Sequence, residues 1–534
     1  MIGVVLAVVA DVVAAAEAAP ADPAEVVIGE RLFLETRFAQ FFAAHAGADV
    51  NQPLLAGDPV VATTETLSGA IPNPFRGQAM NCRSCHFVDD QKETPGGGSR
   101  AYNDFARQSP IPARADGALV APRNSPVLVG STLSRRLPLS LHFDGEFPSA
   151  MALVRGTFTG RNLGWLPDES GAAIAHIARV IREDDGTVPG AAEAGGAYRR
   201  VLAGRDASLP RALRLPRRFR LDIARASDED IMDGVARLVA AYVESLDFAR
   251  DDSGAFNGSP YDRFLQKNRI PRKPSGGEST AAYLGGLRSR LAATTPTFID
   301  SADGKFELHP QSFQFGPAEL EGLQVFLSPT RGNCVACHVP PNFTDFGFHN
   351  TGVSQRDYDH IHGAGGFAAI FIPDAATRAA APDVFLPRSP LHPQAAEPFR
   401  AVLNLNRPGA TDLGMWNIFQ NPDHDDRRFQ RSLARHVCTA AGIRSGCRHR
   451  VQLEQALGLF KAPTLRDLGH SAPYFHAGSV DTLEETVQFY VDASAAAHAG
   501  TLRNGARELL QMNLLPTDVA PLAAFLRALN EDYE

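Results

Sequence analysis

The chain has 534 residues, of which 52 are Lys or Arg and 60 are Asp or Glu, giving a formal net charge of −8. This length predicts two or three domains rather than one small unit. The acidic balance, without any block of basic residues, argues against nucleic acid as a partner. A hydrophobic content of 44% is sufficient to bury a core.

Residues 1–19 are predicted to be a secretory signal segment. Residues 2–10 are apolar and residues 14–19 offer small-residue cleavage sites, although a basic start is missing and Asp11 interrupts the apolar run. No other stretch approaches about 18 uninterrupted apolar residues, so we expect no stable membrane span. The segment predicts export across the inner membrane and a periplasmic location.

Two copies of the motif C-x-x-C-H follow, at residues 82–86 and 334–338. This spacing is the attachment pattern of a c-type haem, in which two thiols bond the haem vinyl groups and the histidine ligates the iron. A zinc site would need two further ligands at short range. We therefore expect two covalently bound haems. The predicted cofactor-binding residues are Cys82, Cys85, His86, Cys334, Cys337 and His338.

Helical patterns dominate the remainder of the chain. Residues 227–230 resemble a capping box and precede apolar residues at helical spacing up to Leu246. Pro317 opens a second amphipathic run, and residues 522–529 form a last helix. Strand patterns are few, and Gly/Pro-rich loops are long. This predicts a mainly α fold of two cytochrome c-type haem domains with long loops and few short strands.

The two halves of the chain repeat loosely. Residues 29–34 precede the first motif and residues 322–327 precede the second, and both share the pattern Gly-x-x-x-Phe-Leu. This pattern indicates a duplication. We expect a boundary in the polar, Pro-containing region between Lys267 and Gly316. The N-terminal haem domain is placed at residues 25–300 and the C-terminal haem domain at residues 301–534.

Two cysteines, Cys438 and Cys447, lie outside the haem motifs and are nine positions apart. In an oxidising compartment they would form a short-loop disulfide. The alternative is a pair of free thiols.

Several segments resemble the bacterial di-haem cytochrome c peroxidase and MauG-like superfamily. Residues 461–466 and 471–479 are similar to its signature K-x-P-T-L-R…T-A-P-Y-x-H-x-G-S, and residues 482–487 continue the match. Residues 348–352, after the second motif, and residues 123–126 and 143–145, after the first, are similar as well. The matches recur in order from about residue 28 to 530, so the resemblance covers most of the chain.

The resemblance implies different tasks for the two haems. The N-terminal haem, ligated by His86, would have an open distal face that binds peroxide or oxygen. The C-terminal haem, ligated by His338, would be six-coordinate and would transfer electrons. Its second axial ligand in the family is Met or Tyr, fourteen residues after the signature histidine, and counting from His476 reaches Tyr490.

The residues around Tyr490 predict a helix with Asp481 as its N-cap and Glu484 as the capping partner. Leu483, Val487 and Tyr490 would then share one face. Tyr490 is either the axial ligand or a core tyrosine with a hydrogen-bonded hydroxyl. His476 is expected beside the haems as a cofactor-binding residue that does not ligate iron. The remaining candidates for the axial position are Met415 and Met512.

The family also places a calcium ion between the haems, held by an asparagine side chain and two backbone carbonyls. The matching positions are Asn124, Ser471 and Pro473. Oxygen ligands of this kind suit a hard cation. The alternative for Asn124 is a turn residue.

Two departures from the family pattern bear on activity. Phe143 stands where relatives carry a tryptophan relay between the haems. Peroxidase relatives also carry a distal glutamate as general acid and base, but residues 157–164 contain no carboxylate. Nearby substitutes for the missing acid are Glu146, Asp168 and His142.

Phe158 would instead make the distal pocket apolar, as in the di-haem rubber oxygenases of the same superfamily. The predicted catalytic residues are His86, Phe158 and Glu146. The first hypothesis is a peroxidase-type oxidoreductase that receives electrons from a small redox protein or an oxidisable substrate. The alternatives are a dioxygen-using oxygenase or protein-modifying enzyme, and a non-enzymatic di-haem electron carrier.

Overall fold

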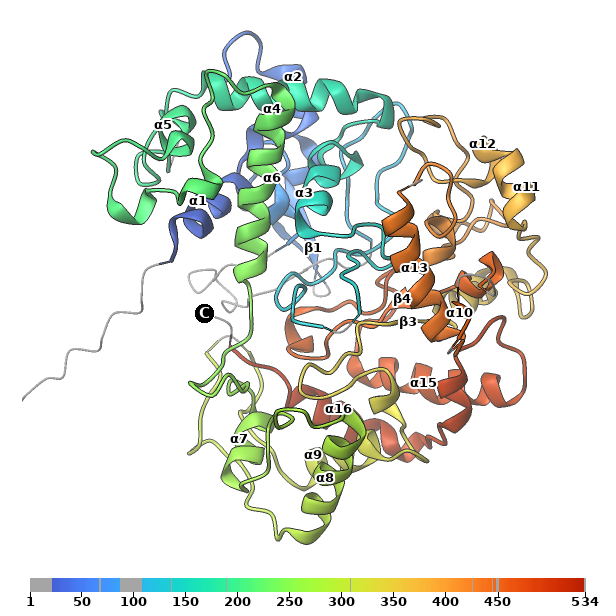
Figure 1. The fold of residues 1–534 in the computed structure, drawn as a ribbon. Coiled ribbons are helices and arrows are strands. Elements are labelled where there is room, and N and C mark those ends of the chain that lie inside the picture. The colour runs from blue at the N-terminus through green and yellow to red at the C-terminus, as the bar shows by residue number, and fades with distance from the viewer. Residues whose placement is uncertain are drawn as a thin grey trace, which may run out of the picture.

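The computed structural model describes residues 22–66, 69–86, 108–135, 137–188, 190–307, 309–424, 426–443, 445–447 and 451–532. The predicted signal segment lies outside this range. The described chain is mainly helical, and its strands form two antiparallel pairs (Figure 1). β1 (Thr63–Thr66) pairs with β2 (Gly69–Pro72), and β3 (Phe348–His349) pairs with β4 (Phe460–Lys461). The predicted fold class is confirmed.

The helices of the N-terminal half gather at the top of Figure 1. The longest is α6, which begins after Ser227 with the predicted capping box. The Ser227 hydroxyl accepts the Asp230 N–H at 3.1 Å, and the Asp230 carboxylate accepts the Ser227 N–H at 3.0 Å. The helices are α1 (Ala24–Phe33), α2 (Gln40–His45), α3 (Ala150–Phe158), α4 (Ser170–Glu183), α5 (Tyr198–Ala203) and α6 (Asp228–Ser245).

The C-terminal half holds the second group of helices. Pro317 opens α9 as predicted. α11 and α12 lie at the right of Figure 1, and α7, α8 and α9 lie at its lower end. The helices are α7 (Pro260–Lys267), α8 (Thr280–Ala293), α9 (Pro317–Leu327), α10 (Val353–His362), α11 (Ala375–Ala380), α12 (Pro382–Phe385), α13 (Arg427–Ala440), α15 (Leu483–His498) and α16 (Val519–Arg527).

The start of α15 differs from the prediction by one residue. Thr482, not Asp481, is the N-cap, because its hydroxyl accepts the Glu485 N–H at 3.2 Å and the Glu485 carboxylate accepts the Thr482 N–H at 3.1 Å. Glu484 turns away and accepts hydrogen bonds from Arg527 at 2.8 and 2.7 Å. The predicted inward face is unaffected, since it depends on helical spacing and not on the cap.

The repeated glycine pattern corresponds to a repeated helix crossing. In the first half, a Cβ on Gly29 of α1 would lie 2.2 Å from the Leu238 carbonyl oxygen of α6. In the second half, a Cβ on Gly322 of α9 would lie 1.9 Å from the Pro521 carbonyl oxygen of α16. Glycine is therefore required at both crossings for close backbone approach. Each half thus packs the helix that carries its repeated glycine against its own last helix.

The apolar residues form two large core clusters, spanning residues 24–256 and 261–529, and a third around Trp416. Helices α7 and α8 pack in the second cluster, although the predicted boundary assigned them to the first. Tyr261 of α7, for example, lies 5.8 Å from Phe525 of α16 between ring centroids. We propose to place the domain boundary between Phe256 and Tyr261.

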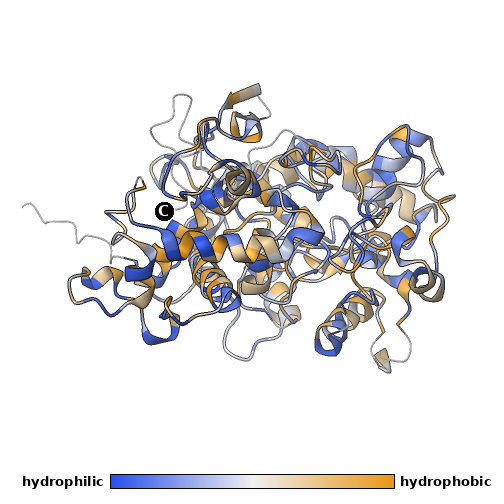
Figure 2. Cartoon of the chain, turned by 90° about the horizontal axis from the view of Figure 1, so that it is seen from above, coloured by the Kyte–Doolittle hydropathy of each residue, from blue (hydrophilic) through white to orange (hydrophobic). Residues whose placement is uncertain are grey.

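Figure 2 shows hydrophobic and hydrophilic residues interleaved along the helices. Within the described ranges, no helix is long and apolar enough to cross a bilayer. α13 illustrates the pattern, because Phe429 and Leu433 are buried while its arginines are exposed. Cys438 near its end forms a disulfide with Cys447. The predicted disulfide is confirmed.

Candidate functional site

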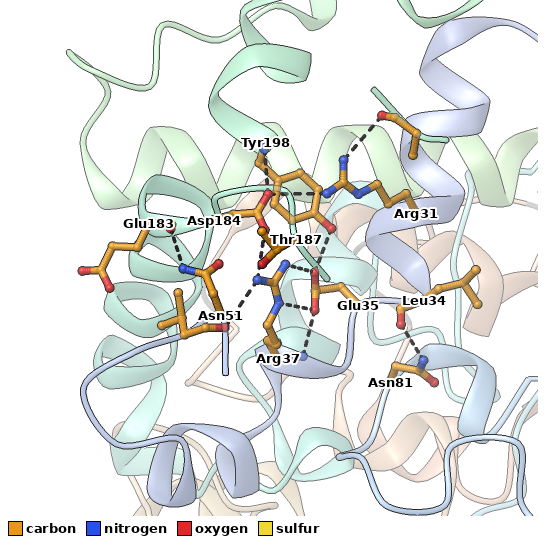
Figure 3. Close-up of polar contacts among 12 residues, drawn as sticks. Arg31, Leu34, Glu35, Arg37, Asn51, Asn81, Glu183, Asp184, Thr187 and Tyr198 are labelled. Carbon is orange, nitrogen blue, oxygen red and sulfur yellow. Dashed lines mark hydrogen bonds and ion pairs between the residues drawn. The ribbon is translucent and has the colours of Figure 1, made fainter. Parts of the chain in front are cut away.

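The first C-x-x-C-H motif forms a short turn, Cys82–Ser84, capped by Asn81. The Ser84 N–H donates to Asn81 Oδ1 at 2.9 Å, and Asn81 Nδ2 donates to the Leu34 carbonyl at 2.7 Å (Figure 3). The His86 N–H donates to the Cys82 carbonyl at 3.0 Å. Cys82 and Cys85 carry free thiols, whose pKa burial raises to about 12. The turn therefore presents two free thiols and one imidazole within five residues.

A buried ionic cluster lies beside this turn (Figure 3). Arg37 Nε donates to Glu35 at 2.8 Å, and Arg37 Nη1 lies 3.0 Å from Asp184. The Tyr198 hydroxyl donates to Glu35 at 2.8 Å, and the Arg31 guanidinium lies 4.0 Å from the Tyr198 ring centroid. Burial would raise the pKa of Glu35, but Arg37 outweighs it and lowers the pKa. Two arginines facing two carboxylates make the cluster neutral, so it holds the backbone next to the motif without a buried net charge.

The second motif forms the corresponding turn, Cys334–Ala336, and its thiols are also free. The His338 N–H donates to the Cys334 carbonyl at 2.8 Å, and His338 Nδ1 donates to the Phe343 carbonyl at 3.1 Å. A backbone acceptor at Nδ1 fixes the tautomer and leaves the Nε2 lone pair for a metal. Burial lowers the pKa of His338, which keeps the ring neutral. The imidazole therefore has the protonation state of a metal ligand.

A cavity of about 260 Å³ lies against the second motif. Its lining comes from both halves of the chain: the motif itself, residues 124–127 from the segment after the first motif, and residues 460–465 of the signature. Many of the other lining side chains are apolar, among them Phe326, Val487, Leu509, Leu522 and Leu526. An apolar cavity bordered by two thiols and an oriented imidazole fits a tethered porphyrin.

One segment contacts both motifs. Ser125 lines the cavity of the second motif and also hydrogen-bonds the Cys85 thiol of the first. The next residue, Pro126, lines the same cavity, and its backbone interacts with His86. Residues 124–127 therefore lie between the two candidate haem sites.

Tyr490 and Met512, two of the candidates for the second axial ligand, line the cavity. Met415 does not, because it is fully buried in the cluster around Trp416. The cavity therefore does not favour Met415, and Tyr490 and Met512 remain the predicted candidates. Within the described chain, no hydrogen bond to the Tyr490 hydroxyl is found, whereas the core alternative requires one. Burial, together with the Cys337 and Cys334 thiols, raises the pKa of Tyr490.

His476 lies in the cavity wall. Its ring stacks on Phe460 with centroids 3.7 Å apart, and its carbonyl accepts the Asn124 N–H at 2.7 Å. Burial lowers the pKa of His476 to about 4, although the charge of Asp412 acts in the opposite sense. The ring is therefore neutral and held by stacking.

Asn124, Ser471 and Pro473, the predicted calcium ligands, all line the cavity. Asn124 Nδ2 donates to the Pro473 carbonyl at 2.9 Å, while Asn124 Oδ1 accepts the Ser125 N–H at 2.9 Å. A cation would need the Asn124 amide turned so that its oxygen faces that carbonyl. The three positions are brought together, with a direct hydrogen bond between two of them.

Glu146 is ion-paired rather than free to donate a proton. Arg400 Nη1 donates to Glu146 Oε1 at 3.0 Å, and His142 Nδ1 lies 3.1 Å from Oε2. Burial would raise the pKa of Glu146, but Arg400 and His142 outweigh it and hold the pKa well below its usual value. A carboxylate kept ionised is a poor general acid at neutral pH. Asp168, the other carboxylate considered, is exposed.

His142 lies close enough to the first motif for its charge to act on His86. Burial, with a contribution from the charge of His142, lowers the pKa of His86 to about 4. The next residue, Phe143, lines the cavity of the second motif. Phe158 is fully buried and packs edge to face on Phe38 with centroids 5.3 Å apart, in the cluster against which Cys82 and Cys85 pack.

A buried triad near the cavity went unnoticed in the sequence. Asp467 lies 2.9 Å from His309 Nε2 and 2.9 Å from His470 Nδ1. The two imidazoles stack with centroids 3.8 Å apart at an angle of 21°. A metal bound in the plane of one ring would lie outside the plane of the other, so this geometry suits two hydrogen bonds to one carboxylate better than a shared ion.

Two cations in the cavity lining were also missed, Arg135 and Lys461. Lys461 is the first residue of the signature, so the sequence motif could have identified it as a site residue. Arg135 stands in a loop with no motif, and sequence alone offered no reason to select it.

No family model matches the chain. Among curated proteins, it is 26% identical over 138 residues to cytochrome-c peroxidase IdrP1 of Denitromonas iodatirespirans, covering 23% of this chain and 35% of that protein. It is 37% identical over 79 residues to cytochrome-c peroxidase IdrP2 of a Pseudomonas species, covering 15% and 19%. The chain is similar to cytochrome c peroxidases. This confirms the predicted resemblance, although the matches span about a third or less of each relative.

Two solved structures align along nearly the whole chain. One is a MauG-like protein associated with microbial copper homeostasis, at 17% identity and a TM-score of 0.44, covering 96% of this chain and 91% of that one. The other is the diheme peroxidase BthA from Burkholderia thailandensis, at 18% identity and a TM-score of 0.42, covering 96% and 87%. These alignments are too loose to compare individual residues.

Proposed function

We propose that this chain is a periplasmic di-haem c-type oxidoreductase that binds peroxide at its N-terminal site and passes electrons through its C-terminal site. The observation that carries the proposal is the cavity at the second motif, where two free thiols, the oriented His338 and the Tyr490 hydroxyl border one apolar space. These residues fit a haem. When bound, haem iron supplies one-electron chemistry and, with an open coordination position, peroxide binding.

At the C-terminal site, each lining residue has a task. Cys334 and Cys337 would tether the porphyrin, and His338 would ligate its iron with Nε2. Tyr490 would supply its phenolic oxygen as a second ligand, which favours the ferric state. With two ligands supplied by the protein, this site would be suited to accept electrons from a small redox protein or an oxidisable substrate.

At the N-terminal site, His86 is the protein ligand and Cys82 and Cys85 are the tethers. The apolar cluster around Phe158 keeps water away from the thiols and the ring that they hold. Since the pKa of Glu146 is lowered by its ion pair, we assign proton movement to His142, which contacts Glu146 and influences His86.

Calcium is proposed between the two sites, held by the Asn124 side chain and the Ser471 and Pro473 carbonyls. The proposal is supported by the convergence of these groups at the cavity wall. Ligand that binds only the folded state stabilises it by about 2.7 kcal/mol at a concentration of 100 Kd. Calcium should therefore raise the unfolding midpoint of the holoprotein, and Asn124→Ala should remove that response while Asn51→Ala, at a half-buried site outside the cavity lining, keeps it.

The decisive experiment counts and characterises haem in the purified holoprotein. The pyridine haemochrome spectrum should give two c-type haems per chain, and replacing either cysteine pair by alanine should leave one. Low-temperature electron paramagnetic resonance should show one high-spin and one low-spin ferric site. A protein with a single haem, or with no access for small ligands at either iron, contradicts the proposal.

A dioxygen-using oxygenase is the second candidate. It is favoured by the ion-paired state of Glu146 and by the apolar cluster around Phe158, since peroxide cleavage relies on a proton donor. An oxygenated spectrum of the reduced protein that persists for minutes supports this candidate. Rapid peroxide-dependent oxidation of a reduced cytochrome supports the peroxidase-type oxidoreductase. Low-spin signals alone at both irons would point to an electron carrier.

A further inference from the structure

Lys461 and Arg135 bring two positive charges to the wall of the cavity. Lys461 lies in β4, whose pairing with β3 fixes its backbone. Arg135 lies in the loop after the first motif, where its Nη2 donates to the Ser131 carbonyl at 2.6 Å and its Nε to the Leu133 carbonyl at 2.8 Å. The side chains therefore reach one cavity from opposite halves of the chain.

Neither charge is neutralised by a directly paired carboxylate: Asp144, whose charge acts on Lys461, is itself paired with Arg123 at 2.6 Å. Among the described residues, neither Lys461 nor Arg135 has an ion-pair partner, and Glu508 is the one carboxylate in the cavity lining. Burial lowers the pKa of Lys461 to about 7, assisted by the nearby Arg135, and burial lowers the pKa of Arg135 to about 10. A cavity that penalises cations in this way is suited to a dianionic ligand.

We propose that Lys461 and Arg135 bind the two propionates of the haem tethered by Cys334 and Cys337. This inference rests on the proposed function, because it requires a haem in this cavity. Porphyrin offers the cavity an apolar surface and two carboxylates at one edge, which match the apolar lining and the two cations. Charge-assisted hydrogen bonds to carboxylates are among the strongest that side chains form.

The assignment makes the reduction potential of the C-terminal haem depend on both halves of the chain. Ferric haem carries one more positive charge than ferrous haem, so a nearby cation favours the ferrous state. Loss of either cation leaves a propionate uncompensated and stabilises the ferric state. The potential should therefore fall.

The test is the midpoint potential of the low-spin haem in the holoprotein, followed by spectroelectrochemistry. For Lys461→Met and Arg135→Met, we expect the ferric-to-ferrous ratio at a fixed potential to rise at least tenfold, about 59 mV for one electron. Lys461→Arg keeps the charge and should keep the potential. Lys305→Met is the matched control, because it removes the same charge from an exposed pair with Glu307.

The outcomes separate this inference from the proposed function. If Lys461→Met and Arg135→Met load two haems and match the potential of Lys305→Met, the propionate assignment is wrong while the haem assignment stands. If the unmodified protein carries no haem at the second motif, both fail. If Lys461→Met does not accumulate as holoprotein, Arg135→Met and Lys461→Arg provide the test. An unchanged potential in Arg135→Met, or a lower potential in Lys461→Arg, overturns the assignment.

Discussion

Tyr490 offers the sharpest test, because its two interpretations predict opposite effects of one hydroxyl. The hydroxyl borders the cavity and forms no hydrogen bond within the described chain. Tyr490 is only half-buried, so water can reach its cavity-facing hydroxyl when no haem is bound. In protein produced without haem, Tyr490→Phe should therefore change the free energy of unfolding by less than about 0.5 kcal/mol. In the holoprotein, it should remove a ligand and convert the low-spin signal to high-spin.

Tyr474→Phe is the matched control. Tyr474 also lines the cavity, but its hydroxyl donates to the Leu468 carbonyl at 3.0 Å. Loss of that hydrogen bond should cost about 0.5–1.5 kcal/mol and leave the spin state of both haems unchanged. Urea unfolding of the haem-free proteins and low-temperature electron paramagnetic resonance of the holoproteins provide the two measurements.

The spin state of the holoprotein and the stability of the haem-free protein together distinguish a ligand role from a core role for Tyr490. A Tyr490→Phe protein that stays low-spin and loses about as much stability as Tyr474→Phe refutes the ligand assignment. In that case, Met512, the other candidate in the cavity lining, becomes the axial ligand to test next.

Three further predictions concern the remaining sites. His86→Ala should abolish turnover and leave the low-spin spectrum of the second haem nearly intact; retained activity would reverse the roles of the two haems. Glu146→Gln should lower the free energy of unfolding by about 1–3 kcal/mol at pH 7, because Arg400 loses its closer carboxylate partner and keeps only Asp144, at 3.7 Å, and urea unfolding measures this. Since the folded pKa of Glu146 is lowered, its stabilisation is present above the unfolded pKa and is lost as the pH falls through the folded value; a wild-type advantage that disappears near neutral pH would contradict this. Replacing Cys438 and Cys447 by serine should cost about 2–3 kcal/mol from the entropy of the short loop, and reduction of the wild type should cost the same.

Local spacing determined much of this protein. C-x-x-C-H is a contiguous pattern, so its thiols and histidine can be identified from the sequence without knowledge of the fold. Capping at Ser227 and helix initiation at Pro317 depend on residues three positions apart or fewer, and both were predicted correctly. The prediction at Asp481 was wrong because two capping boxes overlap there, and the choice between them depends on Arg527, which is remote in sequence and binds Glu484.

Tertiary structure alone decided what surrounds these motifs. Arg135 and Lys461 are more than three hundred positions apart, and their meeting at one cavity follows from the packing of the two halves. From the sequence, Glu146 is a candidate free carboxylate. In the structure it is paired with Arg400, which comes from the other half of the chain. Sequence therefore specified which thiols and imidazoles are the candidates to tether and ligate a haem, since those residues lie within one turn of chain. Which charges are paired and which face the cavity was fixed by long-range packing, because electrostatic partners are set by distance in space and not by distance along the chain.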